Sequence, residues 1–154
     1  MPSEIITVNG IVVRGYRVAS QKSRDYPYGT IDKQKPFFKK LGLNLDRFYS
    51  GTLNIFIAPL IFIMKHPEYT FRQVEWTDLH PPEDFSFSRC IVIFRGEEYE
   101  ACVYYPHPET KTRHFENASI LEILAVHIPE LNYGDSIEVN LQADEVEVKL
   151  AMQP

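Results

Sequence analysis

The sequence lacks long apolar runs and a signal segment, and each absence excludes a class of protein. Its longest apolar stretch, IFIAPLIFIM, is interrupted by Pro59 and is shorter than the roughly 20 residues that a membrane helix needs. The N-terminus, MPSEIITVNG, has neither the basic start nor the apolar core of a signal peptide. We therefore expect a cytoplasmic protein with no membrane partner.

Short motifs of known chemistry are also missing. The histidines show no HxH or HExxH spacing, and no P-loop, Rossmann or Gly-x-Ser-x-Gly pattern occurs. The only two cysteines, Cys90 and Cys102, form no CxxC pair. They flank an apparent hairpin, CIVIFRGEEYEAC. We expect two buried thiols there, because free cysteine is among the most buried residue types.

The net charge of −5 conceals an uneven distribution along the chain. Residues 1–50 contain nine Lys or Arg and four Asp or Glu, a balance of +5, whereas residues 51–154 contain seven and seventeen, a balance of −10. General nucleic-acid binding needs a broad basic face, so this pattern argues against a nucleic-acid partner. A local pocket for a small anion such as phosphate fits a single basic segment better, although solvated lysines alone also account for it.

What the sequence does contain is a series of short alternating segments rich in branched and aromatic residues. They predict strands over 5–15, 52–57, 71–76, 85–94, 98–105, 136–141 and 145–150. Two short helices are expected, one over 32–43 with Gly42 as a stop signal and one over 118–128 ended by Pro129. The pattern predicts a mainly β protein, residues 1–154 forming one small closed six- or seven-stranded barrel with two short helices.

A long basic and aromatic loop follows the first predicted strand. It runs RGYRVASQKSRDYPYGTIDKQKP from Arg14 to Pro36. Loops of this length are usually functional or disordered. The tyrosines and the closely spaced basic residues favour a functional loop.

Two polar residues interrupt the otherwise apolar strand in FYSGTLNIFI. Thr52 and Asn54 are two apart, so in a strand their side chains project from the same face. One explanation is hydrogen bonding to backbone groups at a barrel corner, and the other is a ligand.

Four segments together, GIVVRG, PFFKKLGLNLDRFYSGTLNI, SILEILA and NYGDSIEV, resemble the CTP-dependent riboflavin kinases known chiefly from archaea. The resemblance covers both ends of the chain but not the region from about 58 to 110. It implies a cradle-loop barrel that binds a nucleotide and a flavin. It also implies Mg²⁺-dependent transfer of the γ-phosphoryl group of CTP to riboflavin, which gives FMN.

The resemblance also assigns roles by position. The threonine and asparagine of GTLN hold magnesium in that family, which implies a metal site at Thr52 and Asn54. Neutral oxygens together with phosphates are reasonable ligands for this ion. The nucleotide-binding loop corresponds to a segment that includes Gly15, Arg17, Lys22, Arg24 and Gly29. The flavin contacts correspond to Thr112, His114 and Glu122.

Other interpretations of these residues are open at this point. Ser119 and Glu122 also match an S-x-x-E capping box, in which the glutamate bonds back to the start of a helix. His114 and Glu122 are alternatively an acid–base pair of another kind of enzyme. The segment WTDLHPPED fits a solvated acidic turn, a divalent-ion loop or, through Trp76, a partner surface. The alternative function is a non-catalytic binding module on the same barrel, with a different small-molecule or protein partner.

Overall fold

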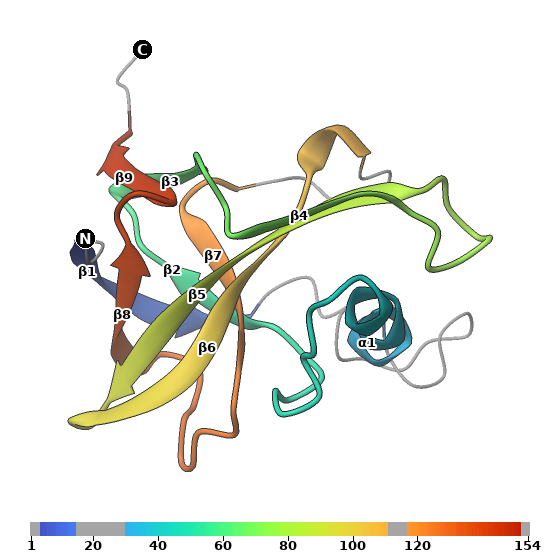
Figure 1. Ribbon diagram of the computed structural model, residues 1–154. Helices are drawn as coiled ribbons and strands as arrows, with labels where there is room; N and C mark the ends of the chain where they lie inside the picture. Colours follow the sequence, from blue (N-terminus) through green and yellow to red (C-terminus); the bar gives the residue numbers. More distant parts are fainter. Residues whose placement is uncertain (1–3, 15–29, 111–116, 152–154) are drawn as a thin grey trace.

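The computed structural model describes residues 4–14, 30–110 and 117–151, and Figure 1 shows their arrangement. Within these residues the chain forms strands, one α-helix and a short 3₁₀ turn. The strands are β1 (Ile5–Val13), β2 (Leu53–Phe56), β3 (Leu60–Met64), β4 (Tyr69–Val74), β5 (Glu83–Phe94), β6 (Glu97–Pro106), β7 (Ile120–Ala125), β8 (Ser136–Gln142) and β9 (Val146–Leu150). The helix is α1 (Thr30–Lys40), and the 3₁₀ turn is η1 (Pro108–Thr110).

Six of the strands close into an antiparallel barrel. Their order is β5–β6–β7–β2–β1–β8, and β8 pairs with the second half of β5 to complete the ring, with Val92 opposite Val139. The closed barrel predicted from the strand pattern is therefore confirmed. β4 is an additional strand that pairs with the first half of β5, and β3 pairs with β9 in a separate two-stranded sheet.

The second predicted helix, at 118–128, is wrong: this segment contains strand β7. The prediction failed because both faces of β7 meet apolar surroundings. Leu121 and Ile123 are buried in the barrel, whereas Leu124 is buried on the outer side. A short apolar run buried on both faces does not reveal its period. The structure has one α-helix among the described residues, where two were expected.

Two apolar cores lie on opposite sides of the barrel wall. The inner core fills the barrel with residues such as Ile55, Val92, Leu121 and Val139, which are fully buried. The second core lies between the outer wall and α1, and Phe38 of the helix packs against the rings of Phe85 and Phe87 there. Figure 1 shows α1 outside the barrel, below the arm that β4 and the first half of β5 form. The part of the outer wall that faces α1 is therefore buried. The candidate site lies at the border of this buried part.

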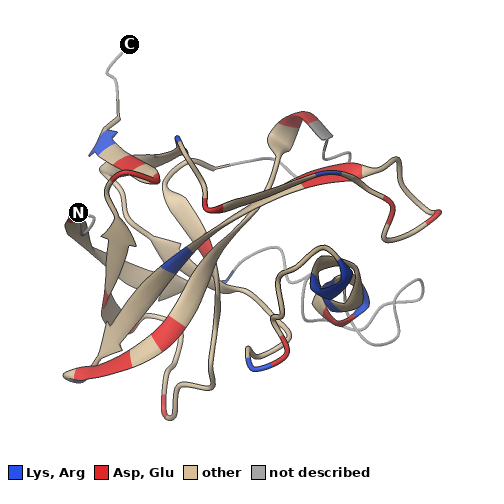
Figure 2. Ribbon diagram, viewed as in Figure 1, with Lys and Arg blue, Asp and Glu red and all other residues tan. Residues whose placement is uncertain are grey.

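Charge is distributed by element. Figure 2 shows lysines on α1 and acidic residues at the tip of the β5–β6 hairpin, where Glu97 and Glu98 lie. In the described part of the chain, no helix is long and apolar enough to span a membrane.

Candidate functional site

The candidate site begins at the turn that leads into β2. The amide of Tyr49 donates to the carbonyl of Ala125 in β7 at 2.9 Å, which attaches this turn to the barrel. β2 then runs with Ile55 buried inside the barrel and Asn54 on the outer face. The Asn54 amide nitrogen donates weakly to the carbonyl of Thr52, at 3.4 Å. Asn54 and Thr52, the residue that precedes β2, are both half-buried.

The pairing of β2 with β7 places Asn54 directly opposite Glu122. Directly paired residues in an antiparallel sheet share a face, so both side chains project from the outer wall. The expected capping box is wrong, because Glu122 lies in a strand. Instead, the Ser119 hydroxyl donates to the carbonyl of Leu60 at 2.8 Å, which joins the start of β7 to β3. Glu122 therefore belongs beside the GTLN turn, although the two segments are distant in sequence.

Tyr104 of β6 continues this line on the far side of Glu122. Val103 pairs with Ile123, so Tyr104 follows in register beside Glu122. The pKa of Tyr104 is raised well above its usual value, mainly by burial, and then by the negative charges of Glu122 and Glu83. Its hydroxyl donates to Gln34 Oε1 of α1 at 2.7 Å. We call Thr52, Asn54, Glu122 and Tyr104 the polar row.

The polar row offers oxygen ligands of the type that magnesium prefers. A hydroxyl and an amide oxygen come from Thr52 and Asn54 respectively. Mg²⁺ binds hard oxygen atoms, and it keeps several water or phosphate ligands besides. These residues therefore fit the ion that the family resemblance implies. The described residues contain no group of three or more His, Cys, Asp and Glu side chains suited to a metal, so a cation here would rely on the mixed set of the polar row.

An apolar strip runs beside the polar row on the same face. Phe56 pairs with Ile11 of β1 on one side and with Ile120 of β7 on the other. Ile11 is 40% exposed and Phe56 is 39% exposed, although both lie within the sheet. An apolar surface bordered by hydrogen-bonding groups is suited to a flat ring with a polar edge.

The other seven predicted site residues all lie outside the part of the chain that the structure describes. The nucleotide-loop residues and two of the flavin contacts lie outside the described residues; these are Gly15, Arg17, Lys22, Arg24, Gly29, Thr112 and His114. The described chain does reach both borders of these segments. Val13, near the end of β1, pairs with Asn54, and β7 carries Glu122 shortly after residue 117.

A second polar cluster has the connectivity of a catalytic triad but not its accessibility. Ser86 Oγ lies 2.7 Å from His107 Nε2, and His107 Nδ1 lies 3.0 Å from Glu109 Oε1. Ser86 is fully buried in β5 between β4 and β6, and its hydroxyl also contacts Thr70 Oγ1 at 2.8 Å. A nucleophile must be reached by its substrate, so this cluster joins strands rather than forming a second active site.

The segment WTDLHPPED also has a structural role. Trp76 is only 4% exposed, and its indole N–H donates to Glu83 Oε2 at 2.7 Å. The interpretation of Trp76 as a surface anchor for a partner is therefore wrong, because the side chain is buried. The Asp84 carboxylate accepts hydrogen bonds from the Gln73 amide and from Arg72, which joins β5 to β4.

Lys35, which was not among the predicted site residues, lies next to the candidate site. Its ammonium donates to the Phe48 carbonyl at 2.6 Å and to Ser50 Oγ at 2.9 Å, in the turn before Thr52. A signal was present, because Ile31, Lys35 and Phe38 have the spacing of one helix face. A lysine on the apolar face of an amphipathic helix is unusual enough to identify it.

Comparisons with known proteins assign no family to this chain. No protein-family model matches it, and no curated protein matches it.

Proposed function

We propose that the protein is a phosphotransferase similar to riboflavin kinase, which binds a nucleotide and a flavin at the polar row. With Mg²⁺, it transfers the γ-phosphoryl group of CTP to the 5′-hydroxyl of riboflavin. The observation that carries the proposal is the pairing of Asn54 with Glu122. It brings together one residue from each of two distant segments that carry the family resemblance.

In this proposal, the residues of the polar row have separate roles in phosphoryl transfer. This reaction needs positioning and charge neutralisation more than a protein nucleophile. Thr52 and Asn54 supply oxygens for the magnesium ion, whose charge neutralises the phosphates. Glu122, in the neighbouring strand, accepts the hydrogen of the hydroxyl that receives the phosphoryl group.

The apolar strip gives the flavin a place next to this chemistry. The exposed side chains of Ile11 and Phe56 cover the sheet beside Asn54 and Glu122. An isoalloxazine ring packed there directs its ribityl chain along the outer wall toward the polar row. Behind this part of the wall, the rings of Phe85 and Phe87 pack against Tyr104.

The test is FMN formation from CTP, Mg²⁺ and riboflavin, followed by chromatography. We expect the wild-type protein to form FMN, and Thr52→Ala or Asn54→Ala to lower kcat/KM by roughly 100-fold, the scale of losing one stabilising group. Thr7 and Asn140 provide a matched control, because they are an exposed, hydrogen-bonded Thr–Asn pair on β1 and β8. Thr7→Ala and Asn140→Ala should leave the rate within about twofold.

The alternative, a binding module without catalysis, predicts a different pattern in the same protein preparations. Calorimetry would then detect a flavin or nucleotide whose binding requires Thr52 and Asn54, but no FMN would form with CTP, ATP, GTP or UTP. Absence of both binding and turnover in the folded wild-type protein would reject the proposed site.

A further inference from the structure

A buried lysine beside the candidate site, Lys35, has hydrogen bonds, but among the described residues no carboxylate lies at ion-pair distance from it. Lys35 is 8% exposed, and its acceptors, the Phe48 carbonyl and the Ser50 hydroxyl, are both neutral. The described lysines with ion pairs are Lys39, bound to Asp46, and Lys65, bound to Glu147. Burying an ammonium is costly unless charge and hydrogen bonds compensate for it. Lys35 therefore needs a further explanation.

The ammonium of Lys35 has the capacity for one more bond. It carries three donor hydrogens, and two of them are used within the turn. Burial lowers the pKa of Lys35, and the charges of Asp32 and Asp46 partly oppose that change. An anion at the third hydrogen would complete the set of partners and hold the amine in its charged form.

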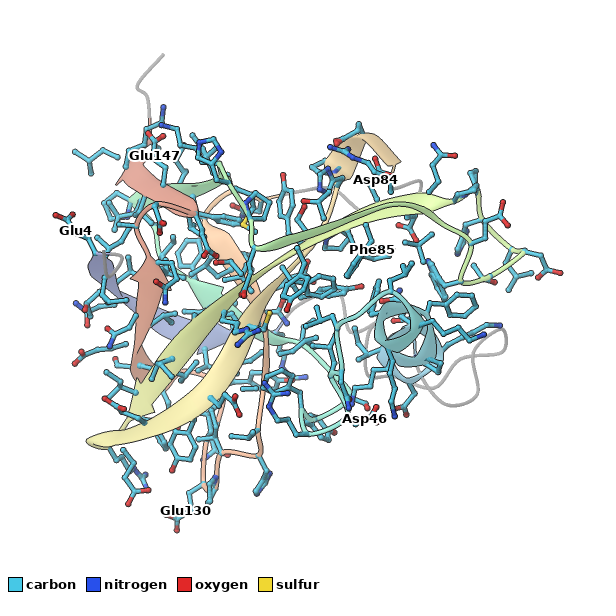
Figure 3. The ribbon with its side chains drawn as sticks, viewed as in Figure 1. Glu4, Asp46, Asp84, Phe85, Glu130 and Glu147 are labelled. Atoms are coloured by element: carbon cyan, nitrogen blue, oxygen red, sulfur yellow. The ribbon has the colours of Figure 1, made fainter. Side chains whose placement is uncertain are left out.

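Lys35 also lines an open groove between α1 and the turn. The groove has a volume of about 640 Å³, and its wall includes Lys39, Asp46, Tyr49 and Ser50. Figure 3 labels Asp46 on the segment that borders α1. The charged side chains of the groove, Asp32, Lys35, Lys39 and Asp46, sum to zero. Affinity for an anion would therefore come from direct contact with Lys35 rather than from the overall field.

The turn connects this groove to the polar row. Ser50 precedes Thr52 by two residues, and the Tyr49 amide is bonded to the β7 carbonyl of Ala125. Only Gly51 therefore separates Ser50, in the wall of the groove, from Thr52 of the polar row.

We propose that Lys35 binds a phosphate of the ligand held at the polar row, which makes it a phosphate-binding residue contributed by α1. This inference rests on the proposed function, because it takes the polyphosphate of a nucleotide as the ligand. A phosphate contact at a charged donor is stronger than one at a neutral donor. The loss of Lys35 should therefore weaken binding in proportion to the phosphates present.

The experiment measures the affinities of CTP, CMP and cytidine for Lys35→Met and Lys40→Met by calorimetry with Mg²⁺. We expect Lys35→Met to weaken CTP binding roughly 10- to 100-fold and to leave cytidine binding within about twofold. Lys40 is the matched control, because it is an exposed lysine at the end of α1 that does not line the groove. Lys40→Met should keep the CTP affinity within about threefold. Equal weakening of CTP and cytidine would overturn the proposal, since it would show that Lys35 only holds the turn.

A measurement on the wild-type protein does not depend on whether the Lys35 variant folds. With ¹⁵N-labelled lysine, tripolyphosphate should shift the side-chain NMR signal of Lys35 and leave that of Lys40, which lies outside the groove lining, in place. Unchanged Lys35 signals at saturating tripolyphosphate would overturn the inference.

The two proposals fail in distinguishable ways. If the wild-type protein binds CTP and Lys35→Met binds it equally well, only the role of Lys35 is rejected. If tripolyphosphate binds through Lys35 but riboflavin and CTP do not react, the phosphate contact stands and the kinase function is rejected.

Discussion

Gly10 occupies a position in β1 where any side chain would meet the neighbouring strand. A Cβ atom there would lie 2.9 Å from the Phe56 carbonyl oxygen and would also collide with the side chain of Ile55. Both atoms belong to β2, the strand that carries Asn54. A glycine here therefore lets β1 and β2 approach closely, as glycines in strands often do.

We predict that Gly10→Ala lowers the free energy of unfolding by about 1–3 kcal/mol, because the backbone oxygen cannot move aside without shifting β2. Urea denaturation followed by fluorescence measures the change. Asn9→Ala is the control at the adjacent exposed position and should change stability by less than about 0.5 kcal/mol. An unchanged midpoint for Gly10→Ala would show that β2 adapts freely.

Asp84 determines how stability responds to acid at the junction of β4 and β5. The backbone N–H of Gln73 donates to its carboxylate at 2.8 Å, and this bond, followed by Arg72, lowers the pKa of Asp84 below its ordinary value of 3.8. A depressed carboxyl pKa stabilises the folded state above the unfolded-state value, and this contribution is lost as pH falls through the folded-state value.

We accordingly predict that Asp84→Asn is less stable than the wild-type protein at pH 7, and that the difference shrinks as pH falls below about 4. Urea midpoints between pH 7 and pH 3 measure this dependence. Glu138→Gln, at an exposed position of β8, serves as the control. A difference between Asp84→Asn and wild type that stayed constant with pH would contradict the role given to the carboxylate.

At the scale of elements, α1 is held to the barrel by one apolar face. Ile31, Gln34, Lys35 and Phe38 are its buried residues, and Phe38 contacts the rings of β4 and β5. The helix contributes Gln34 to Tyr104 and Lys35 to the turn before Thr52. The docking of α1 therefore affects the shape of the candidate site, because two of the site's contacts come from this helix.

Truncation of Phe38 should test this link. We predict that Phe38→Ala lowers the free energy of unfolding by about 3–5 kcal/mol, the usual cost of removing a fully buried aromatic ring. Phe37→Ala removes a neighbouring ring that is only half-buried and should cost clearly less. If the two variants were equally stable, the docking face would not be the one described.

At the scale of the whole molecule, the barrel wall separates two apolar cores. Local unfolding can therefore expose one core to solvent while the other stays buried. Cys90 belongs to the inner core, whereas Cys102 of the paired strand belongs to the core beneath α1. Both thiols are free and buried, as expected from the sequence. Burial raises the pKa of Cys102 to about 12 and that of Cys90 well above its ordinary value, so neither is a thiolate at neutral pH.

We predict that neither thiol of the native protein reacts with a disulfide reagent at pH 8 within minutes. In low concentrations of urea, Cys102 should react first, because undocking of α1 exposes it while exposure of Cys90 requires the barrel to open. The single-thiol variants Cys90→Ala and Cys102→Ala allow each rate to be measured. Faster reaction of Cys90 than of Cys102 would show that the barrel opens before the helix undocks.

Local sequence patterns were sufficient to predict most of the strands. They were insufficient to predict a strand that is buried on both faces. Alternation in β1 and β8 identified these strands, because only one face of each enters the core. The segment around Leu121 and Leu124 carried no such alternation, and it was wrongly predicted to be a helix. β3 was not predicted, since Pro59 precedes a short run that pairs only with β9 near the C-terminus.

The sequence by itself determined that the chain forms a closed β-barrel and that both thiols are buried. These follow from spacing and composition, which act locally along the chain. Only the tertiary structure decided that Glu122 lies opposite Asn54 and that Lys35 contacts the turn before Thr52. Those contacts depend on the register of β2 with β7 and on the docking of α1, which bring together residues that no local pattern connects.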